Sequence, residues 1–249
     1  MTGTRQPYPI VAELPVVTTN QMIEVDRRMI EDIGISLFQM MENAGLQLAN
    51  VARDLFLAGD VSGKRVAILA GTGGNGGGAI VAARRLVNWG ATCNLGLSRS
   101  PHDLSAVAKA QFDILNNISH VDLIEPSALG SGYDLIIDGL IGYSLHGAPH
   151  GKVAAFIAAV NAAHTPVLSL DVPSGFDATP GKAGKPCIRA DTTMTLALPK
   201  FGMIGKGQSD QVGRLLCADI SCPRDVFANL DMDEAYEPPF SMGPVVEVR

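Results

Sequence analysis

The chain has 249 residues, a net charge of −6 and a pI near 5.3. Hydrophobic residues make up 47% and charged residues 18%, which excludes an intrinsically disordered chain. The acidic balance and an aromatic content of 5% argue against a nucleic-acid-binding surface. Glycine is frequent, with 27 residues, and six of them fall between Gly71 and Gly78.

The N-terminal segment and the cysteines indicate the cellular compartment. Residues 1–17 contain Glu13 and three prolines and no apolar stretch, so no signal peptide is predicted. No apolar run is long enough to span a membrane. The cysteines lack the spacing of a zinc or redox motif, and reduced thiols are typical of cytosolic proteins. We therefore expect a soluble cytoplasmic protein. The four cysteines are Cys93, Cys187, Cys217 and Cys222.

The predicted elements alternate along most of the chain. Residues 1–17 form an extended arm, and helical periodicity follows from residue 18 and again over residues 36–57. Apolar runs typical of buried parallel strands then alternate with amphipathic helices, which predicts a parallel sheet covered on both faces. Strands are expected at 65–70, 92–97, 121–124, 134–138, 166–170, 192–198 and 214–220, and helices at 79–89, 105–118 and 152–163.

The end of the sheet and the domain limits follow from the same pattern. No helix is expected between the last two strands, so an antiparallel or irregular edge is predicted there. The acidic, proline-containing residues 229–249 are interpreted as a surface extension. The prediction is one domain over residues 18–228, preceded by the arm and followed by this tail.

The glycine cluster follows a predicted strand and precedes a helix. It satisfies the G-x-G-x-x-G pattern through Gly71, Gly73 and Gly76, and such a turn presents backbone N–H groups to an anion. A dinucleotide-dependent dehydrogenase is one interpretation, although the next strand ends at Arg99 without the usual ribose-binding acid. The alternative is a tight turn that binds nothing.

Two other strand ends carry acids. Asp138 precedes a glycine-containing loop, and Asp171 begins the sequence Asp171-Val172-Pro173-Ser174-Gly175. Each acid could simply cap a turn, but the carboxyl ends of parallel strands meet at one edge, where ligands bind. Asp171 is a candidate general acid–base group. The three strand ends that carry Asn75, Asp138 and Asp171/Ser174 would gather several oxygen ligands at one edge of the sheet, where an alkali or alkaline-earth cation could bind.

Five segments carry a resemblance to a known family. They are Met41-Glu42-Asn43-Ala44-Gly45, residues 71–79, residues 138–145, residues 171–175 and Ala197-Leu198-Pro199-Lys200-Phe201-Gly202. In order and spacing they resemble the YjeF N-terminal domain family. Its enzymatic members are NAD(P)H-hydrate epimerases, and its vertebrate member is the apolipoprotein A-I binding protein.

The resemblance implies a fold, a reaction and a site. The fold would be a three-layer αβα Rossmann-like sandwich with a mostly parallel sheet, often dimeric. The reaction would interconvert the R and S hydrates of NADH and NADPH at ring carbon 6, with Asp171 as acid–base residue. Asn75, Asp138 and Ser174 would bind one K⁺ per subunit, and the partner would be a small nucleotide substrate. The substrate-binding residues implied are Gly74, Asn75, Gly76, Gly77, Gly78, Gly142, Tyr143, Ser144, Leu145 and His146.

Several positions depart from the family pattern and keep alternatives open. Gly74 and Gly78 replace an Asn and an Asp, and Tyr143 stands where the family has a smaller residue. One alternative is a divergent enzyme for another small polar or phosphorylated ligand. A second is a non-catalytic ligand-binding or scaffold module, like the family's mRNA-decapping enhancer. His146 could equally face solvent, and Glu42 and Asn43 could line the site or lie on an exposed helix face.

Overall fold

The computed structural model describes residues 7–118, 121–130, 132–145, 147–178, 182–204, 210–230 and 237–249. A nine-stranded sheet runs in the order β1-β11-β10-β9-β6-β5-β2-β3-β4. All neighbours are parallel except β10 and β11. The strands are β1 Ile10–Val11, β2 Arg65–Ala70, β3 Thr92–Leu97, β4 Asp122–Leu123, β5 Leu135–Gly139, β6 Val167–Leu170, β9 Thr192–Leu196, β10 Arg214–Ala218 and β11 Val245–Val248, with β7 Phe176–Asp177 and β8 Lys182–Ala183 forming a separate pair.

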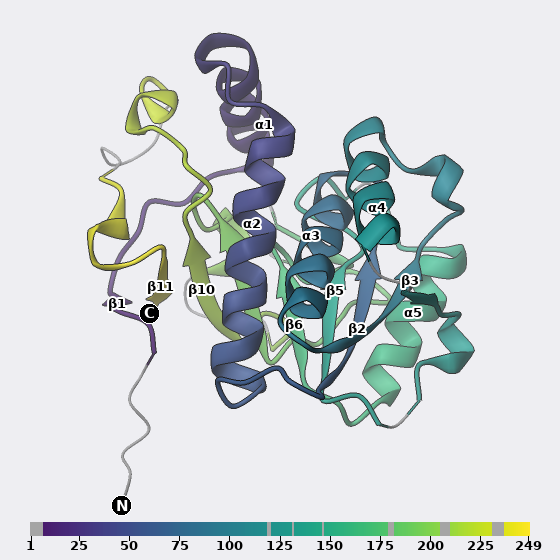
Figure 1. Ribbon diagram of the computed structural model, residues 1–249. Helices are drawn as coiled ribbons and strands as arrows, with labels where there is room; N and C mark the ends of the chain where they lie inside the picture. Colours follow the sequence, from purple (N-terminus) through teal and green to yellow (C-terminus); the bar gives the residue numbers. More distant parts are fainter. Residues whose placement is uncertain are drawn as a thin grey trace, which may run out of the picture.

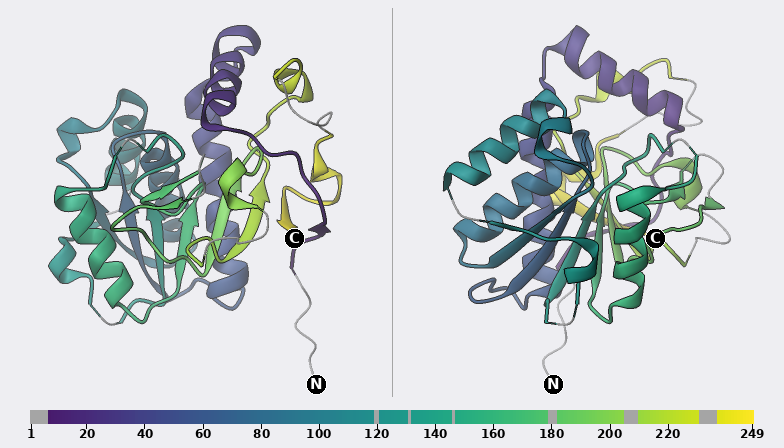
Figure 2. Two further views of the ribbon diagram at one scale, coloured as in Figure 1. Left: turned by 180° about the vertical axis from the view of Figure 1, so that it is seen from behind. Right: turned by 90° about the vertical axis from the view of Figure 1, so that its right-hand side faces the viewer.

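Helices cover both faces of the sheet (Figures 1 and 2). Helices α2, α3 and α4 lie side by side on one face, and α5 packs on the other. The α/β sandwich predicted from the alternating pattern is therefore confirmed. The α-helices are α1 Thr19–Arg28, α2 Leu37–Val51, α3 Gly74–Asn88, α4 Ala106–Ile118 and α5 Gly151–Ala162; π-helical turns at Met29–Ile33 and Ala52–Phe56 extend α1 and α2.

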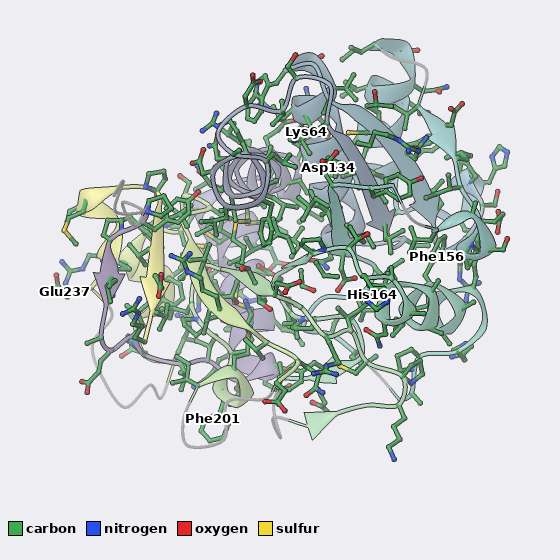
Figure 3. All side chains as sticks on the ribbon, turned by 90° about the horizontal axis from the view of Figure 1, so that it is seen from below. Lys64, Asp134, Phe156, His164, Phe201 and Glu237 are labelled. Atoms are coloured by element: carbon green, nitrogen blue, oxygen red, sulfur yellow. The ribbon has the colours of Figure 1, made fainter. Side chains whose placement is uncertain are left out.

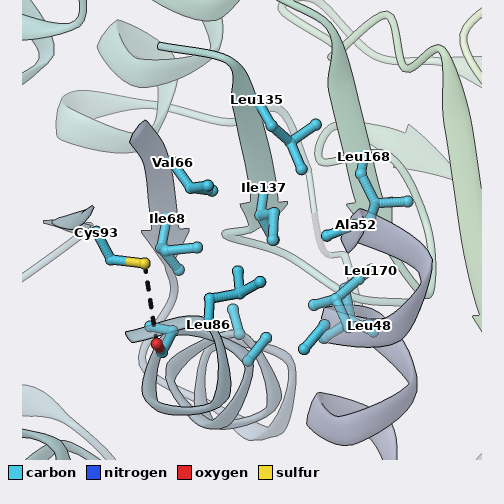
Figure 4. Packing of buried hydrophobic residues seen from close by; sticks show 14 of the residues in the cluster. Leu48, Ala52, Val66, Ile68, Leu86, Cys93, Leu135, Ile137, Leu168 and Leu170 are labelled. Atoms are coloured by element: carbon cyan, nitrogen blue, oxygen red, sulfur yellow. Dashed lines mark hydrogen bonds between the residues drawn. The ribbon is translucent and has the colours of Figure 1, made fainter. Parts of the chain in front are cut away.

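The main core lies between the sheet and the α2–α3 layer (Figure 4). Alternate residues of β2 and β5, such as Ile68 and Ile137, face Leu48 of α2 and Leu86 of α3. The neighbouring residues on these strands point the other way, and Leu69 packs with Phe156 of α5. Burial on both faces explains why these strands appear in the sequence as continuous apolar runs. No helix in the described part of the chain combines the length and apolar character needed to cross a bilayer.

Helix α3 starts at Gly74, five residues before the predicted start at residue 79. Glycine is a weak helix former, costing about 1 kcal/mol against alanine, so the sequence pattern placed these residues in a loop. Packing overrides that tendency. A Cβ at Gly76 would lie 1.9 Å from the Gly71 oxygen, and one at Gly77 would lie 2.5 Å from the Met41 sulfur. The glycines thus let the first turn of α3 fit between the loop before it and α2.

The sheet continues beyond the strands that were predicted. Strand β11, from the segment interpreted as a tail, pairs antiparallel with β10, and β1 of the arm pairs with β11. Glu247 of β11 is buried, with its carboxylate in ion pairs with Arg214 and Arg249. The Val-Val-Glu-Val sequence was not predicted as a strand, because a glutamate considered without its ion-pair partners indicates an exposed segment.

The amino ends of β2 and β5 are joined by a polar contact at the end of the sheet shown in Figure 3. The carboxylate of Asp134 accepts a hydrogen bond from the Arg65 backbone N–H at 2.8 Å and lies 3.5 Å from the Lys64 ammonium. These contacts connect the starts of the two central strands. The candidate functional site lies at their opposite, carboxyl ends.

Candidate functional site

The connections after β2 and β5 separate at the centre of the sheet. The chain leaves β2 for α3 on one face, whereas it leaves β5 for α5 on the other face. Such a switch point opens a crevice at the carboxyl ends of the strands. A cavity of about 510 Å³ lies there, between the glycine turn, the loop after β5, the loop after β6, α1 and α2.

The glycine turn and the first residues of α3 form one wall of this cavity. Gly71 approaches the loop after β5 so closely that a Cβ on it would lie 2.0 Å from the Leu140 oxygen. Gly73 is the N-cap residue and supplies no side-chain cap, so the first N–H groups of α3 are left for another acceptor. Together with the positive end of the helix dipole, they make this wall suitable for a phosphate.

Asp138, near the end of β5 and just before the loop that lines the cavity, is completely buried. Its carboxylate accepts hydrogen bonds from the Ser174 hydroxyl at 2.6 Å, the Ser174 N–H at 2.9 Å and the Ser169 hydroxyl at 2.8 Å. Burial raises the pKa of the Asp138 carboxyl, and these hydrogen bonds act in the opposite direction. Among the described residues no Lys, Arg or His forms an ion pair with it.

The surroundings of Asp138 fit a hard cation. The oxygens nearby are the Ser174 hydroxyl and the Ile141 carbonyl, which lie 3.3 Å apart, and the side chain of Asn75 lies against Gly142 of the same loop. The Asn75 side-chain NH₂ group donates to the Leu170 carbonyl at 3.1 Å. The amide oxygen of Asn75 takes no part in this hydrogen bond and points away from Leu170. An uncompensated buried carboxylate beside neutral oxygens is a donor set that an alkali cation suits.

Asp171 comes directly after β6 and lines the cavity. Its backbone has a φ of +66°, a left-handed conformation that Asp and Asn adopt more readily than most residues. The carboxylate forms an ion pair with the Lys200 ammonium, and the two side chains are only 5% and 1% exposed. The Lys200 ammonium also donates to the Thr195 hydroxyl at 3.2 Å and the Leu196 carbonyl at 3.0 Å. The cavity therefore contains a fixed, desolvated ion pair.

A second acid reaches the cavity from α1. The Tyr143 hydroxyl donates to the Asp26 carboxylate at 2.5 Å, and the Tyr143 ring centre lies 5.8 Å from the Lys200 nitrogen. Burial raises the pKa of Asp26, while the Tyr143 hydrogen bond and the Lys200 charge lower it. Burial and the nearby Asp26 and Asp171 charges raise the pKa of Tyr143, so the phenol keeps its proton.

Most residues predicted for substrate binding line this cavity, but not all of them. Gly77 faces Met41 of α2 instead, and Leu145 lines a neighbouring cavity of about 380 Å³. His146 lies outside the described residues. Those that line the main cavity are Gly74, Asn75, Gly76, Gly78, Gly142, Tyr143 and Ser144.

Asp26 lines the cavity although sequence reasoning did not place it in the site. The sequence leaves Lys200 two interpretations, contact with a phosphate or an aliphatic stem lying along a strand end, and in the structure it lines the cavity and pairs with Asp171. Lys200 had one signal, a lone charge within an apolar segment, whereas Asp26 resembles any acid on an amphipathic helix. Glu42, by contrast, does not line the cavity. Its carboxylate binds Arg84 and Arg85 of α3 at 2.5 and 3.0 Å.

Comparison with known proteins places the chain in a family. Residues 37–202 match the model for the YjeF-related protein N-terminus. A protein of Dehalogenimonas lykanthroporepellens named NAD(P)H-hydrate epimerase is 38% identical, over 93% of this chain and 92% of its own length. A Moorella thermoacetica protein named bifunctional NAD(P)H-hydrate repair enzyme Nnr is 34% identical over 86% of this chain, which spans only 42% of that longer protein.

A solved structure agrees with the fold. The crystal structure of yeast ynu0 superposes with a TM-score of 0.78, covering 94% of this chain and 100% of the yeast chain at 24% identity. The matched family segment contains the glycine turn, both acidic strand ends and Lys200, whereas Asp26 precedes it. The chain therefore belongs to the YjeF-related N-terminal family.

Proposed function

We propose that the protein epimerises hydrated NADH and NADPH, interconverting the R and S configurations at ring carbon 6. The observation that carries the proposal is the desolvated Asp171–Lys200 ion pair in a cavity beside a phosphate-suited helix start. Two relatives named for the same activity support it, each matched over more than nine-tenths of its own length.

The reaction requires a proton to be given and then taken back. The C6–O bond of the hydrate breaks with its electron pair on oxygen, the ring N1 lone pair forms a C6=N1 bond, and the departing hydroxyl takes a proton. Water then attacks C6 from the other face, the electron pair returns to N1, and the water loses a proton. No electron acceptor is needed, so the nucleotide is substrate and not redox cofactor.

The Asp171–Lys200 pair suits this sequence for an electrostatic reason. Once the pair has given a proton to the hydroxyl, it carries one negative charge in total and faces a ring that has become positive. The positive charge is on the Lys200 ammonium before the proton transfer and on the substrate ring after it. The negative Asp171 carboxylate stabilises the positive charge in each case. In a cavity shielded from water such a fixed charge is worth far more than in solvent.

The other walls have matching tasks. The uncapped N–H groups at the start of α3 and the Arg99 side chain, which lines the same cavity, would hold the phosphates of the nucleotide. Asn75, Asp138 and Ser174 would hold K⁺, which supplies positive charge to the buried Asp138 carboxylate when bound. On the family resemblance we further propose that the protein is a homodimer and is located in the cytoplasm. Size-exclusion chromatography with light scattering tests the first, and cell fractionation tests the second.

The decisive experiment supplies the purified protein with the separated S and R hydrates of NADPH and follows their interconversion by chromatography. Asp171→Asn is the matched variant, because Asn also tolerates the positive φ found here and keeps the size of the side chain. We expect acceleration over the spontaneous rate by the wild type and its loss in Asp171→Asn. Absence of acceleration by the wild type would refute the proposal.

The cation is tested separately by thermal unfolding. At equal ionic strength, KCl should raise the unfolding midpoint of the wild type above its value in tetramethylammonium chloride, because the cation binds only the folded chain. Ser174→Ala removes one proposed ligand and should abolish the difference. Equal midpoints of the wild type in the two salts would contradict a K⁺ site.

A further inference from the structure

Helix α1 contributes a second proton-exchanging group to the cavity. Asp26 of α1 and Tyr143 of the loop after β5 both line it, and their side chains are joined by the 2.5 Å hydrogen bond. The Tyr143 ring in turn lies over the Lys200 ammonium, which is paired with Asp171. The contacts therefore connect two carboxylates, supplied by different elements, through a phenol and an ammonium. Figure 2 shows α1 lying across one end of the molecule, apart from the helix layer that packs on the sheet.

Epimerisation needs acid–base groups on two faces of the ring. The hydroxyl leaves from one face of C6 and water enters at the other, so a group in contact with one face is badly placed for the opposite one. A general acid or base must lie within hydrogen-bond reach of the proton that it moves. Asp171 and Lys200 come from the ends of β6 and β9, whereas Asp26 and Tyr143 come from α1 and the loop after β5.

The two carboxylates also differ in their surroundings, as acid–base partners do. Asp171 faces the Lys200 ammonium directly. Asp26 faces the Tyr143 hydroxyl, feels the charges of Lys200 and Asp171 at longer range, and lies near the thiol of Cys222. On α1 itself the neighbouring arginines are occupied by other partners, since both pair with Glu24.

We propose that Tyr143, backed by Asp26, is a second proton-exchanging group for the substrate and serves the water or hydroxyl that the Asp171–Lys200 pair does not serve. The proposal rests on the epimerase activity proposed above. In one direction, the entering water gives a proton to the Tyr143 oxygen as its O–C6 bond forms, and Tyr143 passes its own proton to the Asp26 carboxylate. In the other direction, protonated Asp26 returns that proton to Tyr143, which protonates the leaving hydroxyl. Tyr143 is thus a catalytic residue, and Asp26 positions it and holds the proton.

The observed hydrogen bond has the polarity that this relay requires. Tyr143 donates to Asp26, so a proton arriving at the phenol oxygen can displace the one already directed at the carboxylate. The raised pKa of Tyr143 keeps the phenol protonated, and burial brings the pKa of Asp26 upward, toward the range in which a carboxylate can accept a proton near neutral pH.

The test measures kcat and KM from pH 5 to pH 9 for the wild type, Tyr143→Phe, Asp26→Asn and Asp26→Glu, with the separated hydrates of NADPH. In the wild type, kcat/KM should fall toward acid pH as the Asp26 carboxylate, whose pKa is raised by burial, takes up a proton. In Tyr143→Phe and Asp26→Asn, kcat should fall by about 10²–10⁴-fold, the range for loss of one acid–base group, and the acid limb should disappear.

Conservative and control variants make the outcome unambiguous. Asp26→Glu restores a carboxylate and should recover part of kcat together with the acid limb. Asp32→Asn alters an exposed acid at the end of the same helical segment, away from the cavity, and should match the wild type. Wild-type rates in Tyr143→Phe and Asp26→Asn, or a loss confined to KM with an unchanged pH profile, would overturn the inference alone. No acceleration by the wild type would overturn the proposed function and this inference with it.

Discussion

The buried ion pair in the cavity makes a strong prediction about stability. Replacing Lys200 with Met removes the ammonium and leaves the Asp171 carboxylate without its cation, in a site where the two side chains are 1% and 5% exposed. Breaking a buried pair from one side typically costs about 3–5 kcal/mol, because the remaining charge is desolvated and unpaired. We therefore expect Lys200→Met to lower the free energy of unfolding by about that amount, even though Met fills most of the space.

A double-mutant cycle in urea measures this coupling. Asp171→Asn combined with Lys200→Met removes both charges, so the double variant should be more stable than Lys200→Met alone. Lys109→Met is the matched control, because its pair with Asp113 is 36% and 50% exposed and should contribute at most about 0.5 kcal/mol. A loss in Lys200→Met no larger than in the control, or strictly additive effects in the cycle, would refute the reasoning.

Three further predictions concern packing, protonation and thiol reactivity. Gly76→Ala should lower the thermal midpoint, because its Cβ would meet the Gly71 oxygen at 1.9 Å and overpacking costs about 1–3 kcal/mol or more; Gly74→Ala, with only ordinary contacts, should not. Burial raises the pKa of Asp26 in the folded protein, so folding favours the protonated carboxyl. The stability that results is fully present below the unfolded-state pKa of about 3.9 and is lost as pH rises through the folded-state pKa. Asp26→Asn should therefore gain stability relative to the wild type between pH 4 and pH 8 in urea titrations, and a constant difference would contradict this. Burial raises the pKa of all four thiols to about 12, so iodoacetamide at pH 8 should modify the folded protein far more slowly than the urea-unfolded chain; the thiols are Cys93, Cys187, Cys217 and Cys222.

The sequence predicted the strand-end residues of the site because strand position is a local property. Apolar runs located β5 and β6, and the rule that parallel strands present their carboxyl ends at one edge brought Asp138 and Asp171 to the same region. The glycine turn was placed in the same way. These inferences need only the order of elements along the chain and the direction of each strand.

The residues that sequence reasoning missed depend on contacts between distant segments. Asp26 belongs to a helix whose place over the cavity is set by packing, and nothing in the spacing of its apolar residues indicates which acid turns inward. Glu42 shows the same limit, since the sequence left open whether it lines the site or lies on an exposed helix face, and only the packing of α2 on α3 pairs its carboxylate with two arginines. The early start of α3 was missed because helix propensity counts each glycine as unfavourable and ignores the close packing that glycine permits.

The pairing of β1 with β11 has a consequence for how the protein folds during synthesis. Ile10 lies beside Glu247, so β1 obtains its partner only after all the intervening strands have been synthesised. Contacts of such high sequence separation form slowly and late. Until β11 is available, β10 presents unpaired backbone groups, which invite association with other chains. Nascent chains should therefore depend on chaperone protection at this side of the sheet longer than at the β2–β3 side, where partners follow one another closely in sequence.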